Sequence, residues 1–140
     1  MRPGTLYLLG PGTTVRAIAD ELGIEKTLLG VDAVVDGELA GSDLNEQSIL
    51  ELLDRHPQAA IIVTPLGGNG FIFGRGNKPF TPHVLRRVGL DNILVIANRD
   101  KLLGFPSLHV DTGDAELDDA LAGYIDVIVG RDYRKLMRVL

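Results

Sequence analysis

The feature that most constrains this chain is a strand, turn and helix pattern near its beginning. The apolar run Leu6–Leu9 predicts a buried strand, and apolar residues from Val15 to Leu22 recur at helical spacing. Between them lies a glycine-rich turn, here called the glycine loop, made of Gly10, Pro11, Gly12, Thr13 and Thr14. Unpaired backbone N–H groups and the helix dipole make such a helix start favourable for an anion.

Two interpretations of the glycine loop remain open at this point. In the first it is a phosphate site, in which glycines let the ligand approach the backbone and threonine hydroxyls donate hydrogen bonds. In the second it is a tight turn whose threonine merely caps the helix. A short glycine-rich turn alone does not separate the two.

The rest of the chain alternates apolar runs with helix signals. This alternation predicts a single α/β domain over residues 1–140, with a Rossmann-like, mainly parallel sheet and helices on both faces. The expected strands after the first are residues 27–35, 39–41, 59–64, 92–97, 108–110, 124–129 and 135–139.

Helix boundaries are marked by capping residues. Asp43 and Glu46 have the spacing of a capping box for a helix through Arg55, while Thr81 and Asp114 are expected to cap two later helices. Residues 65–82 lack periodicity and are expected to form a long irregular loop, and loops of that kind are often functional.

In parallel sheets, ligands bind beyond the carboxyl ends of the strands. The residues that follow predicted strands are 10–14, 36–38, 65–77 and 98–101, and they are expected to meet at one edge. Candidate binding residues at this edge are Gly10, Pro11, Gly12, Thr13, Thr14, Asp36, Gly67, Gly68, Asn69, Gly70, Arg75, Asn77 and Lys101.

Several of these candidates have a second interpretation. Asp36 is expected either to accept a ribose hydroxyl or to serve only in an Asp-Gly turn. Lys101 is either a phosphate partner or a solvated surface lysine. Residues 67–70 with Arg75 and Asn77 either shape a ligand loop or contact another subunit or domain.

Composition excludes several classes of protein. The chain contains no cysteine, so it has no disulfides and no thiolate chemistry. A formal net charge of −5 argues against nonspecific nucleic-acid binding. No apolar run is long enough for a bilayer span and no signal peptide is recognisable, so a cytoplasmic location is expected. The three histidines lack metal-ligand spacing, and no nucleophile–base pair stands out, so no catalytic or metal residues are predicted.

Three motifs together resemble the C-terminal part of the ATP-NAD kinase-like family, which includes acetoin-catabolism X-type proteins. They are residues 8–14 (LLGPGTT), residues 64–77 (TPLGGNGFIFGRGN) and residues 110–114 (VDTGD). The resemblance implies a domain that binds a nucleotide or another phosphorylated small molecule, in a protein that phosphorylates NAD with ATP and Mg²⁺. Family members carry a Gly-Gly-Asp-Gly-Thr motif in an N-terminal domain, and this chain lacks it. The isolated chain is therefore expected to bind rather than to catalyse.

A more distant resemblance is to ribose-5-phosphate isomerase-like folds. It rests on the glycine loop, Asp36-Gly37, the glycines of residues 67–70 and Lys101. The stretch that carries the proton-transfer carboxylate in those isomerases, here residues 71–79, contains none. A sugar-phosphate enzyme remains one alternative function, and an assembly module that docks a partner domain or forms a homo-oligomer is another.

Overall fold

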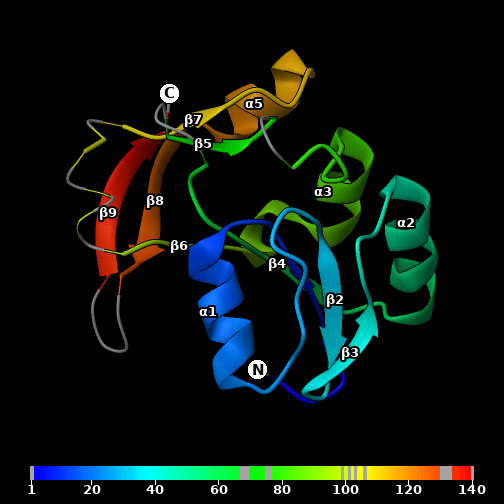
Figure 1. Cartoon of the computed structure of the whole chain (residues 1–140). Coiled ribbons are helices and arrows are strands. Elements are labelled where there is room, and N and C mark those ends of the chain that lie inside the picture. The colour runs from blue at the N-terminus through cyan, green and yellow to red at the C-terminus, as the bar shows by residue number, and fades with distance from the viewer. Residues whose placement is uncertain are drawn as a thin grey trace.

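The computed structural model describes residues 2–66, 70–74, 77–98, 100, 102, 104–105, 107–129 and 134–139. Its main sheet has seven strands in the order β3-β2-β1-β4-β6-β8-β9, and β5 pairs with β7 in a separate two-stranded sheet (Figure 1). The strands are β1 (Leu6–Leu9), β2 (Asp32–Val35), β3 (Glu38–Gly41), β4 (Ala59–Val63), β5 (Phe71–Phe73), β6 (Ile93–Ile96), β7 (His109–Val110), β8 (Gly123–Ile128) and β9 (Arg134–Val139). The helices are α1 (Thr13–Glu21), α2 (Glu46–Arg55), α3 (Pro82–Val88) and α5 (Ala115–Leu121), with a 3₁₀ turn η1 (Leu90–Asn92).

The centre of the main sheet is parallel. Strands β1, β4, β6 and β8 pair in parallel, whereas β2 and β3 on one side and β9 on the other pair antiparallel. The central strands are almost wholly apolar, which is typical of strands buried on both faces. The expected α/β class with a mostly parallel central sheet is confirmed.

Helices cover both faces of this sheet. On one face, Val15 and Ala19 of α1 pack with Tyr7, Leu9 and Ile62. On the other face, residues of α2, α3 and α5 join alternate residues of the same strands in one core, which includes Leu6, Leu8, Ile49, Ile61, Val63, Val84, Leu85 and Leu117. The alternation of side chains along a strand therefore sends successive residues of β1 and β4 to two different helical layers.

Several local predictions are confirmed. Asp36 and Gly37 both have positive φ, 52° and 76°, which is the backbone of a type I′ turn, and they join β2 to β3 as a hairpin. The side chain of Thr81 caps α3 with Pro82 in its first turn, and the side chain of Asp114 caps α5. Strands β8 and β9 correspond to the strands expected over residues 124–129 and 135–139, and they pair antiparallel.

Three local predictions are wrong. Asn45, not Asp43, caps α2, because its side chain accepts a hydrogen bond from the N–H of Ser48. Residues 27–31 do not extend β2, which begins only at Asp32. The long loop after β4 contains strand β5, which pairs in parallel with β7 (Figure 1).

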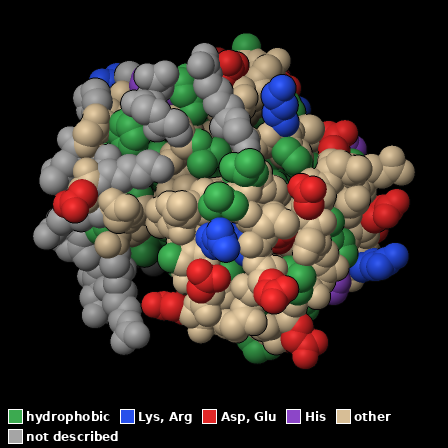
Figure 2. All heavy atoms as spheres, in the orientation of Figure 1, with side chains coloured by type: hydrophobic (Ala, Val, Ile, Leu, Met, Phe, Trp, Pro, Cys, Tyr) green, Lys and Arg blue, Asp and Glu red, His purple; other side chains and the backbone are tan. Residues whose placement is uncertain are grey.

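Among the described residues, the Lys and Arg side chains on the face shown in Figure 2 are scattered and do not gather in one area. Acidic side chains are dispersed over the face that includes α1, β3 and α2. This distribution agrees with the formal net charge of −5. Within the described ranges, no helix combines the length and the hydropathy that a membrane span requires.

Candidate functional site

The glycine loop follows β1 at the carboxyl edge of the parallel strands. Leu9 is aligned with Ile62, and the N–H of Gly10 donates to the carbonyl of Ile62 at 2.9 Å. A Cβ on Gly10 would lie 3.1 Å from Cγ1 of Val63 and 3.4 Å from the Phe80 ring. Glycine at this position therefore lets the loop lie tightly against β4.

Gly12 is the N-cap residue of α1 and has φ of 111°, a backbone conformation that favours glycine. Among the described residues, no side chain caps this helix, in contrast to α2, α3 and α5. The exposed Thr13 and half-buried Thr14 form its first turn, whose N–H groups have no partner within the helix. The structure therefore presents backbone donors at the place where the sequence predicts an anion site.

Thr64 lies on the other side of the loop, directly after β4. A Cβ on Gly12 would lie 3.0 Å from Cγ2 of Thr64 and 3.4 Å from Leu66. Thr64 is 1% exposed, and in the described part of the chain its hydroxyl has no hydrogen-bond partner. A buried polar group without a partner is rare and requires an explanation.

The connections that leave β1 and β4 cross to opposite faces of the sheet. The helix after β1 is α1, which packs with Leu9 and Ile62, whereas the helix after β4 is α3, which packs with Val63 on the other face. The neighbouring parallel strands β1 and β4 therefore form a topological switch point, the usual location of ligand sites in open α/β sheets. Gly12 and Thr64 lie at this point.

A polar network fixes the loop of residues 26–31 beside the glycine loop. The N–H of Gly12 donates to the carbonyl of Leu28 at 2.9 Å. The carboxylate of Asp32 accepts hydrogen bonds from the Lys26 ammonium group at 3.0 Å, from the N–H and hydroxyl of Thr27, and from the N–H of Asp43 at 2.7 Å. Lys26 also donates to the carbonyls of Thr27 and Gly30, so its three donors are all used.

Lys26 and Asp32 have completely buried side chains. Burial, which disfavours the charged ammonium group, lowers the pKa of Lys26, and the hydrogen bond to Asp32 partly offsets this effect. The pair neutralises two charges and occupies their hydrogen-bonding groups. We therefore assign it to holding the backbone next to the site rather than to contacting a ligand.

The expectation that Asp36 joins the glycine loop is wrong. Strand β2 runs antiparallel to β1 and aligns Val35 with Leu6, so Asp36 lies at the opposite edge of the sheet. There its carboxylate accepts a hydrogen bond from the N–H of Gly4 at 2.8 Å. Because of the same reversal, Asp32, at the start of β2, aligns with Leu9 beside the glycine loop.

Asn77 lies in the long loop after β4 and is 1% exposed. Its amide donates to the carbonyl of Ile72 at 2.8 Å and accepts from the N–H of Gly74 at 3.2 Å. These bonds hold the backbone around β5, so Asn77 shapes the loop. Gly70 packs against Ser107 and Phe105, and its carbonyl accepts from the N–H of His109.

Five candidate residues lie outside the described residues: Gly67, Gly68, Asn69, Arg75 and Lys101. In the described part of the chain, the candidate site therefore consists of Gly10, Gly12, Thr13, Thr14 and Thr64, supported by the Lys26–Asp32 pair.

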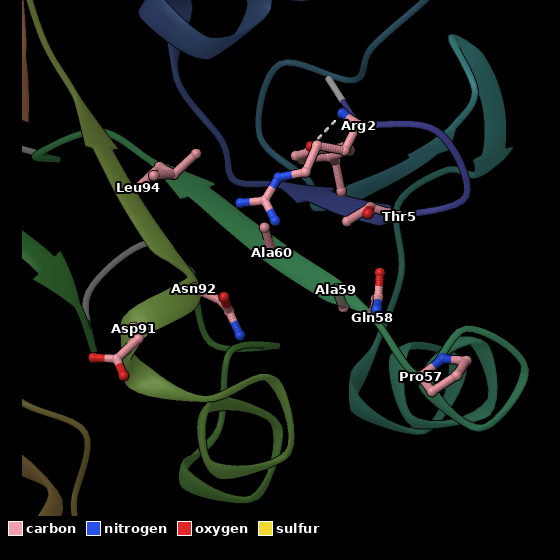
Figure 3. Close-up of a pocket in the computed structure, with 10 residues that line it drawn as sticks. Arg2, Thr5, Pro57, Gln58, Ala59, Ala60, Asp91, Asn92 and Leu94 are labelled. Carbon is pink, nitrogen blue, oxygen red and sulfur yellow. Dashed lines mark hydrogen bonds between the residues drawn. The ribbon is translucent and has the colours of Figure 1, made fainter.

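A cavity of about 330 Å³ lies at the other edge of the sheet, where β1, β4 and β6 begin. In Figure 3 the Arg2 side chain reaches over Ala60, while Asp91 and Asn92 lie across the cavity from it. Some of its polar groups are already paired, since the N–H of Arg2 donates to the Tyr7 hydroxyl at 2.7 Å and Asn92 donates to the carbonyl of Val88. This cavity is separate from the glycine loop.

The site residues fit a phosphate group but not a metal ion. Gly12 lets the loop lie against Thr64, where a Cβ would be too close, and both the first turn of α1 and the Thr64 hydroxyl offer hydrogen-bond donors. In contrast, the described residues contain no group of three or more histidine, aspartate or glutamate side chains that could hold a metal.

Sequence reasoning did not select Lys26, Asp32 or Thr64. A signal was present for Asp32, because it is a lone carboxylate within the apolar residues 31–35. Thr64 was included in the apolar strand, and its position after the last buried strand residue was the available signal. Lys26 carried no sequence signal for burial, because an isolated lysine is usually solvated.

Comparison with known proteins identifies the family. A family model described as the ATP-NAD kinase C-terminal domain matches residues 3–139. No curated protein matches the chain, and no solved structure matches it. Because the family model spans nearly the whole chain, this chain belongs to the ATP-NAD kinase C-terminal domain family.

Proposed function

We propose that this domain binds the phosphate groups of a nucleotide at the glycine loop, as part of an NAD kinase-like protein. The observation that carries the proposal is the start of α1 at Gly12. No side chain in the described part of the chain caps it, and it lies where the connections of β1 and β4 diverge. A helix start of this kind favours negative charge through its N–H groups and its dipole.

The family match supports a nucleotide ligand over other phosphorylated molecules. In an NAD kinase-like reaction, ATP supplies the phosphoryl group that converts NAD to NADP. This chain would contribute position and hydrogen-bond donors, because catalysis of phosphoryl transfer depends mainly on positioning and charge stabilisation. The Gly-Gly-Asp-Gly-Thr motif would come from a preceding domain, so this chain alone is expected to bind nucleotide without forming NADP.

The sugar-phosphate isomerase alternative receives less support. Such an enzyme needs a positioned carboxylate for proton transfer. Asp36 lies at the other edge of the sheet, and the carboxylate of Asp32 is buried and occupied by Lys26, Thr27 and Asp43. Neither carboxylate is available to a ligand at the glycine loop.

Thermal unfolding with a ligand panel tests the proposal. NAD, NADP, ATP, ribose 5-phosphate and inorganic phosphate are compared, since a ligand at one hundred times its Kd adds about 2.7 kcal/mol of stability. We expect a rise in Tm with a nucleotide that is lost in the double variant Thr13→Ala with Thr14→Ala. The matched control is Asp36→Asn, at the opposite edge, which should retain the full rise.

Two results would contradict the proposal. One is the absence of a rise in Tm with every nucleotide. The other is a rise that Asp36→Asn abolishes and the threonine double variant retains, because it would place the ligand at the wrong edge. A rise with ribose 5-phosphate alone would favour the isomerase alternative, and formation of NADP by the chain alone would overturn the binding-only role.

A further inference from the structure

Thr64 occupies a position where valine would serve the fold equally well. It follows the apolar residues of β4, is 1% exposed, and has its methyl group directed at Gly12. Its hydroxyl adds nothing to packing that a second methyl group would not supply. The hydroxyl has no partner in the described part of the chain, so its burial makes folding less favourable, because it loses its hydrogen bonds to water.

We propose that the Thr64 hydroxyl is a ligand-binding group that donates a hydrogen bond to a phosphate oxygen bound at the glycine loop. The inference rests on the proposed function, since it places a second donor at the same site. It extends the site from the start of α1 to the neighbouring parallel strand. A phosphate held there is bound from two separate elements of the sheet.

The chemistry around Thr64 favours an acceptor-rich anion. The described polar groups at this point include the N–H donors of the first turn of α1, and the nearby Asp32 carboxylate is neutralised by Lys26. A threonine hydroxyl can donate one hydrogen bond, and a phosphate oxygen is an acceptor that carries charge. Because Gly12 has no Cβ, the start of α1 lies directly against the Thr64 methyl group, which keeps the Thr64 side chain next to the donors of the first turn.

The test compares Thr64→Val with Thr64→Ser in the 140-residue chain. Valine keeps the shape and removes the hydroxyl, whereas serine keeps the hydroxyl and removes the methyl group. Each variant is titrated with inorganic phosphate, ATP and NAD by calorimetry, and its unfolding by urea is measured without ligand. Thr5→Val, another buried threonine located at the opposite edge, is the matched control for binding.

Thr64→Val is expected to be at least as stable as the wild type without ligand. It should also bind the nucleotide about tenfold or more weakly, because a hydrogen bond to a charged oxygen is lost. Thr64→Ser should keep affinity within about threefold, and Thr5→Val should not change it. If the hydroxyl serves binding at the expense of stability, its removal weakens nucleotide binding without lowering the free energy of unfolding. Removal of a hydroxyl with a structural role would lower the free energy of unfolding.

A failure of this inference can be distinguished from a failure of the proposed function. If the wild type binds the nucleotide and Thr64→Val binds it equally, the inference is wrong and the proposed function stands. If Thr64→Val instead loses stability without ligand, the hydroxyl has a structural partner and the inference is also wrong. If the wild type binds none of the probes, the proposed function fails, and this inference fails with it.

Discussion

The ammonium group of Lys26 lies 3.0 Å from a carboxylate oxygen of Asp32, and both side chains are completely buried. Asp32 also accepts the N–H of Asp43, which connects the start of β2 to the segment that leads into α2. Gly12 donates to Leu28 in the loop that this pair holds. The pair therefore fixes the backbone on one side of the glycine loop, although neither charge reaches the ligand site.

Removing one partner of this pair should be strongly destabilising. We expect Lys26→Met to lower the free energy of unfolding by about 3–5 kcal/mol, because it leaves the Asp32 carboxylate buried without its counter-charge. Urea unfolding at neutral pH measures the change. The double variant Lys26→Met with Asp32→Asn should recover part of the loss, since asparagine removes the charge and keeps an acceptor.

The control for that experiment is the exposed pair between Arg87 and Asp54, joined at 2.9 Å. Arg87→Met should change the unfolding free energy by less than about 1 kcal/mol, because solvent screens exposed ion pairs. Equal losses in Lys26→Met and Arg87→Met would show that the buried pair has no special role.

Gly74 should tolerate no side chain. Its φ is 96°, and a Cβ there would lie 1.8 Å from the carbonyl oxygen of Asp111, so β5 and the residues after β7 would have to separate. That movement would break the hydrogen bond from the N–H of Asp111 to the carbonyl of Phe73. Gly74→Ala is expected to lower the free energy of unfolding by about 3 kcal/mol or more, because backbone strain and steric overlap add.

Gly113→Ala separates these two contributions. Gly113 also has positive φ, 85°, but no atom of the described residues lies within 4 Å of its Cβ position. Gly113→Ala should therefore lower the free energy of unfolding by only about 1–2 kcal/mol, through backbone strain alone. If the two alanine variants unfold at the same urea concentration, the contact between Gly74 and Asp111 is not as close as described.

Asp114 should make the stability of the protein depend on pH in the acidic range. The hydrogen bond from Arg86 at 2.8 Å, and then that from the N–H of Leu117, lower the pKa of this carboxyl. A lowered acid pKa contributes stability that is complete above the ordinary value of 3.8 and is lost as pH falls through the lower folded value. The wild type should therefore lose more stability than Asp114→Asn over that range.

Urea midpoints measured from neutral pH downward check this expectation. Asparagine keeps an oxygen that can accept from Leu117 but cannot form the ion pair, so the difference between the two proteins should shrink as the medium becomes acidic. Asp119→Asn, an exposed change on the same helix, should leave the pH profile of the wild type unchanged. A constant difference between wild type and Asp114→Asn at every pH would contradict the account.

The sequence predicted those elements whose signals are local. Buried runs such as Leu6–Leu9 and Ala59–Val63, the caps at Thr81 and Asp114, and the Asp36-Gly37 turn are all set by neighbouring residues. The position of the glycine loop at a strand end was predictable for the same reason. These features depend on residues that are close in the sequence and not on contacts with distant parts of the fold.

The direction of β2 was not predictable, because an apolar strand has the same pattern in either direction. After α1, residues 22–31 carry the chain back to the carboxyl edge, so β2 starts beside Leu9 instead of ending there. This single reversal moves Asp36 away from the site and brings Asp32 beside it. Thr64 was missed for a related reason, since the lack of a partner for a hydroxyl is a property of the folded structure.

The most direct test of the central claim is to locate bound phosphate by NMR. Inorganic phosphate and ATP are titrated into ¹⁵N-labelled protein while the backbone amide signals are followed. The account predicts the largest changes at Gly12, Thr13, Thr14 and Thr64, with none at Arg2 or Asn92 beside the cavity of Figure 3. Changes confined to Arg2 and Asn92, or no saturable change at the glycine loop, would contradict it.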